Sequence, residues 1–429
     1  MTEAVRTAAA PSRLSAIWSA WNDPAARMRT ADWLAGLIVV LLPWTTTGVG
    51  IAVVLWLIAF APTVEPRALL QSFKRPVSAL PLAFFALVLL GTLWSDASWH
   101  DRSHQLSQVG KFLVLPLLVY HFERSARGLN VFVAFLISCL LLALVSGVVA
   151  LDPALSAKLY LSRGPYLPTS GIFVKNYIDQ GQEFSLCAVA LAYPVVTALR
   201  DGRNGKALLL AAAALALVAN MMFVVTSRTA LVTMPVMLVI FLLLHLRWRV
   251  ALAAICGMAL LTAGAWYGSP HLRATVAKFF IDYRLTMVLN NESGLGSRLI
   301  YWDKSLRFFA DAPVIGHGTG STRSLFEKAA VGQLGAEAVV VSDPHNQTLN
   351  VAVQWGAVGV ILLYALWITH LLLFRGEGLV SWIGLLVVIQ NMLTSIFNSH
   401  LFDFNEGWIY VLGVGIAGGM TLARRAKAR

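Results

Sequence analysis

The chain alternates apolar runs with short polar segments along most of its length. Twelve apolar runs are predicted to form helices in a membrane: 32–46, 48–64, 78–94, 109–122, 129–151, 179–199, 206–225, 229–246, 249–268, 346–374, 379–398 and 406–423. A helix needs about 20 mainly apolar residues to cross a bilayer. Two runs are short for a full span, whereas 346–374 is long enough to tilt or to extend beyond the bilayer. The pattern predicts an all-α polytopic membrane protein with about 12 transmembrane helices.

Composition supports a lipid environment. The chain of 429 residues is 58% hydrophobic and 13% charged, whereas a soluble domain is about 25% charged. The net charge of +12 does not indicate nucleic-acid binding, because most basic residues fall in short loops between apolar runs. The three cysteines lie inside apolar runs without metal-ligand spacing, so we expect them to be packing residues.

Charge also predicts the orientation. With the N-terminus inside, 19 of the 33 basic residues fall in inside segments, and every inside segment carries at least one. We therefore expect both termini to be cytoplasmic. The expected division of the chain is an N-terminal segment, nine spans, a large periplasmic loop, three spans and a basic tail: 1–31, 32–268, 269–345, 346–423 and 424–429.

The predicted periplasmic loop has helical patterns of its own. Apolar residues recur at helical spacing over 271–289, where interspersed basic residues favour a position on the membrane surface. Two further helices are expected over 297–312 and 321–335, with Ser297 and either Ser321 or Thr322 as N-caps.

One histidine stands where this loop meets the next predicted span. In Ser342-Asp343-Pro344-His345-Asn346-Gln347, Asp343 suits a helix N-cap and Pro344 the first helical position. His345 would then lie in the first helical turn, at the positive end of the helix dipole. That environment favours the neutral imidazole, the form that a general base requires.

The order of motifs in this region is similar to that of a known family. Ser297-Arg298-x-x-x-Trp302, then Pro313-x-x-Gly316-x-Gly318, then Pro344-His345-Asn346 before a terminal group of spans resembles the Wzy-C/O-antigen ligase family. The resemblance implies a GT-C-like, inverting glycosyltransferase that takes glycan from undecaprenyl pyrophosphate and needs neither ATP nor a metal or other cofactor. The implied partners are undecaprenyl-pyrophosphate-linked O-antigen, lipid A–core and membrane lipids. The implied location is the inner membrane, with the site facing the periplasm.

The resemblance also implies roles for three residues. His345 matches the family's periplasmic histidine, Arg298 its loop arginine, and Arg228 the arginine of a short periplasmic turn. The chain has no Asp-x-Asp pair, and the nearest approach is Asp403-Phe404-Asn405-Glu406. Arginines can stabilise the leaving pyrophosphate in place of a metal. Arg228 is notable because a guanidinium between two apolar spans is costly and usually functional.

Several other polar residues are weaker candidates. Arg102, Lys111, Arg163 and Lys175 are further candidates for binding phosphate. Asp179 and Glu183 lie one helical turn apart and are expected either to pair with basic groups or to form an ion-coupling pair. His317 is interpreted as a turn histidine. His100 and His104 have metal-like spacing but lack a recognisable third ligand.

Three other functions remain open from the sequence. An O-antigen polymerase uses the same donor with a lipid-linked glycan as acceptor, and a protein O-oligosaccharyltransferase uses a protein acceptor. The modest second loop, 152–178, favours a ligase over a polymerase only weakly. A secondary transporter would show inverted repeats and charged broken helices near the midplane, and the sequence has no clear repeat.

Overall fold

The structure is a computed structural model that describes residues 23–152, 154, 171–172, 174–225, 227–268, 270–294 and 296–428. Every regular element in these ranges is a helix. The α-helices are α2 (Pro24–Leu41), α3 (Thr46–Phe60), α4 (Pro66–Phe73), α5 (Pro76–Leu90), α6 (Trp99–Gly110), α7 (Val114–Arg124), α8 (Gly128–Leu151), α10 (Tyr177–Ala190), α11 (Ala192–Arg200), α12 (Asn204–Asn220), α13 (Arg228–His245), α14 (Trp248–Gly268), α15 (Pro270–Met287), α16 (Gly296–Asp311), α17 (Ser321–Ala330), α18 (Gln347–Leu373), α19 (Leu379–Thr394) and α20 (Phe404–Lys427).

Each apolar run coincides with a helix or a pair of helices, so the all-α membrane class is confirmed. Within the described residues, six helical segments are long and apolar enough to cross a membrane, or seven if the pair α4 and α5, bent by 81°, is one span. Three shorter apolar helices lie in α13, α14 and α19. The total of twelve spans and the domain boundaries therefore stay predictions.

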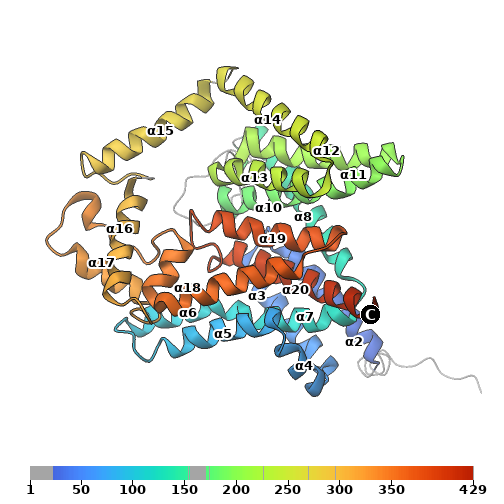
Figure 1. The fold of residues 1–429 in the computed structure, drawn as a ribbon, viewed down its shortest axis with the longest axis horizontal. Coiled ribbons are helices and arrows are strands. Elements are labelled where there is room, and N and C mark those ends of the chain that lie inside the picture. The colour runs from blue at the N-terminus through green and yellow to red at the C-terminus, as the bar shows by residue number, and fades with distance from the viewer. Residues whose placement is uncertain are drawn as a thin grey trace, which may run out of the picture.

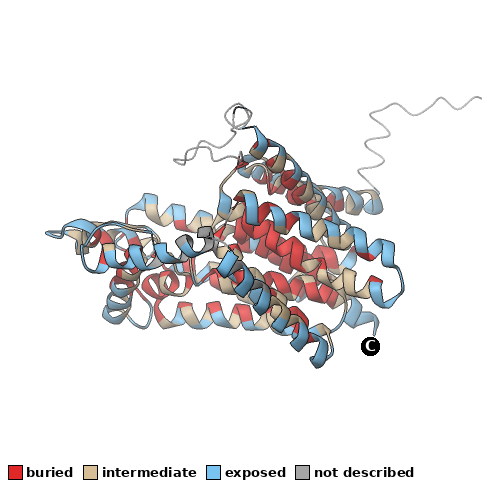
Figure 2. Ribbon diagram, turned by 90° about the horizontal axis from the view of Figure 1, so that it is seen from above, coloured by how far each residue is buried: buried red, intermediate tan, exposed pale blue. Residues whose placement is uncertain are grey.

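Helix α20 is buried along most of its length, and Figure 2 shows that the buried residues gather in the helices at the middle of the bundle. The glycines of α20 allow close packing, because a Cβ on Gly419 would lie 2.6 Å from the Val119 carbonyl oxygen of α7. A Cβ on Gly413 would likewise lie 2.7 Å from the Val387 side chain of α19. Small residues are how helices approach closely in a membrane, where burying apolar surface provides little driving force.

Helix α18 is broken at Trp355 and Gly356, where the backbone leaves helical geometry. Residues 313–318 fill the break. The N–H groups of His317 and Gly318 donate to the carbonyls of Val353 and Gln354 at 3.0 and 2.8 Å, and Ala357 N–H donates to the Pro313 carbonyl at 2.8 Å. The Pro313-x-x-Gly316-x-Gly318 motif therefore supplies the hydrogen bonds that the helix gives up, as buried backbone requires.

The segment that carries this motif also joins α18 to α5 and α6. Thr319 N–H donates to the Gly91 carbonyl at 3.0 Å, and Gly320, at φ +80°, lies against the backbone of Asp101 and Arg102. Helices α15, α16 and α17 lie at one end of the molecule and the C-terminus at the other (Figure 1).

Three of the expected helix caps are wrong. Helix α16 begins at Gly296, so Ser297 lies in its first turn, where its hydroxyl accepts from Ser293 N–H. Helix α17 follows Gly320 and has no side-chain cap. Helix α18 is capped by Asn346, whose side chain accepts from Leu349 N–H, so the helix starts three residues later than Asp343 would place it.

Candidate functional site

The turn between α19 and α20, residues 395–403, brings together side chains from distant parts of the chain. Arg298 of α16 donates to the Phe397 carbonyl at 2.9 Å. The buried Gln347 accepts from Leu401 N–H at 2.9 Å, and the buried Lys111 donates to the Phe402 carbonyl at 2.9 Å. We call this segment the α19–α20 turn. It connects Arg298 of the large loop, Gln347 at the start of α18 and Lys111 just before α7 to the last two spans.

His345 lies beside this turn and not in a helix. Its backbone is left-handed, with φ +56°, because Asn346 has taken the N-cap position. The Asp343 carboxylate accepts from His345 N–H at 2.9 Å and from the Ser399 hydroxyl at 2.7 Å, which fastens the segment to the α19–α20 turn. The expected place of His345 in the first helical turn is therefore wrong, although it remains at the start of the span.

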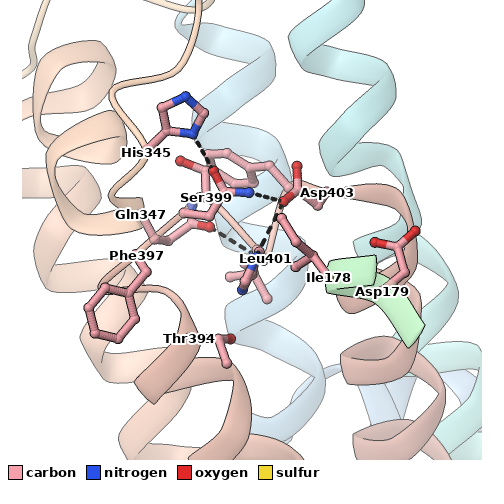
Figure 3. Close-up of polar contacts among 12 residues, drawn as sticks. Ile178, Asp179, His345, Gln347, Thr394, Phe397, Ser399, Leu401 and Asp403 are labelled. Carbon is pink, nitrogen blue, oxygen red and sulfur yellow. Dashed lines mark hydrogen bonds and ion pairs between the residues drawn. The ribbon is translucent and has the colours of Figure 1, made fainter. Parts of the chain in front are cut away.

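The imidazole of His345 is oriented by Asn398. His345 Nδ1 lies 2.6 Å from Asn398 Oδ1, and Asn398 Nδ2 donates to Asp403 Oδ2 at 2.7 Å (Figure 3). The second bond fixes the amide with its oxygen toward His345, so Nδ1 is assigned the proton, which in the neutral imidazole leaves the lone pair on Nε2. Figure 3 shows Nε2 pointing away from this network.

Two groups at the end of the network away from His345, Asp403 and His400, have shifted pKa values. Burial, reinforced by the nearby Asp343, raises the pKa of Asp403 from 3.8 to about 7. Burial also lowers the pKa of His400 to about 3, with further lowering by Arg298 and His345. His400 is therefore neutral, and its 3.9 Å approach to the Asp403 carboxylate is not an ion pair between two charged groups.

The motif Ser297-Arg298-x-x-x-Trp302 has a structural counterpart. Arg298 and Trp302 lie four residues apart on one face of α16. The Trp302 indole N–H donates to the Pro344 carbonyl at 3.1 Å, next to His345, while Arg298 reaches the α19–α20 turn. Helix α16 thus holds both segments from which the His345–Asn398 pair is built.

The other expected site residues fall in different places. Lys111 is at the site, but its ammonium group also donates to the carbonyls of Leu401 and Asp403 and so holds the backbone of the turn. Arg102 donates to the carbonyls of Ala97 and Thr92 at 2.8 and 3.0 Å in the turn before α6.

The backbone of Arg228 begins α13, where Gly181 of α10 lies against Ser227. The Arg228 side chain and all of Arg163 lie outside the described residues.

Sequence reasoning missed Asn398, His400 and the part played by Asp403. These residues line a cavity of about 280 Å³ next to the α19–α20 turn, together with Asn176, Ile178, Asp179, Phe404, Asn405 and Glu406. The available signals were the short predicted outer segment 399–405 and the acidic run that starts at Asp403. Neither signal indicates which loop these residues meet.

Comparison with known proteins supports the family suggested by the motifs. Residues 211–364 match the family model described as O-antigen ligase, and the matched range contains Arg228, Arg298, the segment that fills the α18 break, and His345. No curated protein matches the chain. The resemblance is therefore confirmed for the matched segment, which supports an O-antigen ligase-type function in a chain with several candidate membrane spans.

Proposed function

We propose that the protein transfers O-antigen polysaccharide from undecaprenyl pyrophosphate to lipid A–core at the periplasmic face of the bacterial inner membrane. His345 Nε2 takes the proton of an acceptor hydroxyl while that oxygen attacks the anomeric carbon. The bond from this carbon to the phosphate oxygen breaks, and its electron pair leaves with the pyrophosphate. Attack opposite the leaving group inverts the anomeric configuration. The reaction needs no ATP, because the donor is already activated.

The hydrogen bond between His345 Nδ1 and Asn398 carries this proposal. A general base needs a neutral imidazole of defined tautomer, with a lone pair directed at the proton. Asn398 supplies an acceptor to Nδ1 and has its own orientation fixed by Asp403. This is the arrangement of a base, an orienting group and a carboxylate that supports the orienting group.

Arg298 and Arg228 are the proposed ligands of the pyrophosphate, without a metal ion. Arg298 stands on the same turn as the residues that orient His345, and guanidinium groups bind phosphate oxygens in a bidentate manner. Arg228 begins a helix beside Gly181, two residues from the cavity residue Asp179. Lys111 and Arg102 contribute by holding backbone. Lys111 does so directly under the α19–α20 turn.

The proposed orientation has both termini in the cytoplasm. It is supported by the basic residues of the predicted inside segments and by the position of the C-terminus at the end of the molecule opposite α16 and α17 (Figure 1). The donor is delivered at the outer face, where it needs no further activation.

The decisive experiment is His345→Ala in cells with an intact polysaccharide pathway. Removal of a general base costs about 10²–10⁴-fold in rate, so the O-antigen ladder on lipopolysaccharide should disappear. His100→Ala is the matched control, because His100 is exposed on α6. A persisting ladder at normal protein level would show that His345 is not the base.

A deletion strain separates the two nearest functions. Loss of a ligase leaves bare core and accumulates long lipid-linked polysaccharide, whereas loss of a polymerase leaves core capped with a single repeat unit. Normal lipopolysaccharide would contradict both.

A further inference from the structure

The cavity beside the α19–α20 turn has a composition that catalysis by His345 does not account for. Three carboxyl groups line it, Asp179 from α10, Asp403 from the turn and Glu406 from the start of α20. Figure 3 shows Asp179 across from the turn that carries Asp403. Asn398 lines the cavity and also binds His345, so the cavity adjoins the proposed base.

Three deeply buried side chains in its lining have polar atoms without a hydrogen-bond partner among the described residues. Asn405 is 2% exposed, and its Nδ2 has none. His400 is 1% exposed, and its Nδ1 has none. Glu406 is 7% exposed, and its Oε1 has none. An unsatisfied buried polar atom costs about 1–3 kcal/mol, so native proteins rarely leave one without a ligand or water. All three side chains line the cavity, so a polar ligand in it supplies hydrogen-bond partners that the described residues do not.

The chemistry of the lining selects the class of ligand. None of the lining residues is an arginine or a lysine, so the donor's pyrophosphate is assigned to Arg298 and Arg228 and not to this cavity. In the described part of the chain no three His, Cys, Asp or Glu side chains are placed to hold a metal ion. Carboxyl oxygens accept hydrogen bonds from hydroxyl groups, and a neutral imidazole and the amides of Asn176 and Asn398 both donate and accept. A neutral ligand rich in hydroxyl groups fits this set.

We propose that this cavity is a saccharide-binding subsite, lined by Asp179, His400, Asp403 and Glu406, for a sugar next to the bond being formed. The subsite rests on the proposed function for its place in the reaction. Its ligand is a sugar of either the acceptor core or the donor glycan, since both are rich in hydroxyl groups.

Binding to the purified full-length protein tests the subsite without requiring turnover. The probes are core oligosaccharide and O-polysaccharide, each released from its lipid, titrated separately by saturation-transfer NMR. Asp179→Asn removes a charged acceptor, and Ile178→Trp fills the cavity without changing charge. Each variant should weaken binding of at least one probe roughly tenfold or more, because hydrogen bonds to charged groups are the strong ones. The probe whose binding weakens identifies the sugar as acceptor or donor.

Two control variants separate the outcomes. Asp303→Asn, on an exposed side chain of α16 paired with Arg307, should bind both probes as wild type does. His345→Ala should abolish transfer yet keep binding, so failure of the base assignment would leave the subsite intact. If Asp179→Asn does not fold, the binding of the two probes to Ile178→Trp tests the subsite. Wild-type affinity in both cavity variants, or binding that EDTA abolishes, would overturn the proposal.

Discussion

Asn398 shows how one side chain can set the state of another. Its oxygen lies 2.6 Å from His345 Nδ1, and its nitrogen is committed to Asp403. Without this amide, neither the tautomer of the imidazole nor the direction of its Nε2 lone pair would be fixed. The sequence identified His345 because it stands beside a predicted helix start, but Asn398 lies 53 residues later, at the end of the second predicted span that follows. No local pattern connects the two positions.

Asn398→Ala should reduce the turnover rate while leaving the KM values for donor and acceptor nearly unchanged. The loss should be roughly tenfold or more, and smaller than the loss of the base itself, about 10²–10⁴-fold. Steady-state transfer by purified protein measures both parameters. Asn291→Ala, at an exposed position after α15, is the control and should behave as wild type. An unchanged turnover rate would remove Asn398 from the orienting role.

Asp403 predicts a pH dependence of stability. Its pKa is raised by burial from 3.8 to about 7, so the folded protein holds this proton more tightly than the unfolded chain does. The contribution of Asp403 to the free energy of unfolding is therefore undiminished below about pH 4, falls as pH rises, and stays low above about pH 7. In thermal unfolding, Asp403→Asn should gain Tm relative to wild type across that range. Asp303→Asn, which is exposed, should show no such trend, and a constant difference for Asp403→Asn would contradict the assignment.

At the scale of elements, the broken α18 and the segment that fills it form one unit. Gly316 lies at φ +64°, and a Cβ there would come within 2.5 Å of the backbone of Gln354 and Trp355. The sequence indicated that the glycines end a helix in turns. It did not indicate that the turns enter the break of a helix some forty residues later, because the periodicity of 346–374 runs through the break without interruption.

Gly316→Ala should destabilise the protein more than Gly332→Ala does. Both glycines have positive φ, so each alanine pays about 1–2 kcal/mol for the left-handed backbone. Only Gly316 adds a clash with backbone, since a Cβ on Gly332 meets nothing within 4 Å. Thermal unfolding of the two purified variants measures the difference. Equal losses of Tm would mean that the segment does not need this close approach.

At the scale of the whole molecule, α20 runs from the α19–α20 turn at Phe404 to Lys427, so the candidate site and the C-terminus lie at opposite ends of this helix. Figure 1 shows α16 and α17 at the end of the molecule opposite the C-terminus. This arrangement suits a protein whose glycan chemistry takes place on one side of a membrane while its basic tail stays on the other. The large loop is not a separate body, because α16 is hydrogen-bonded to the α19–α20 turn and residues 313–320 are bonded to α18 and α5.

Labelling with a membrane-impermeant maleimide tests this arrangement. In a Cys256→Ser background, Asp303→Cys should react in intact cells whose outer membrane is permeabilised, whereas Ala426→Cys should react only after lysis. The other two cysteines are buried and should stay silent. Reaction of both engineered cysteines in intact cells would place the tail outside and contradict the proposed orientation.

The sequence by itself determined the all-α membrane class, the helical character of the large loop and the family to which residues 211–364 are matched. It also singled out His345 and Arg298. These features depend on hydropathy, on charge and on short ordered motifs, all of which are local. Only the tertiary structure decided that α16, the segment before α18 and the α19–α20 turn meet, and that Asn398 and Asp403 orient His345. Such contacts arise from packing between helices far apart in the chain, and periodicity records which face of a helix is apolar but not which neighbour covers it.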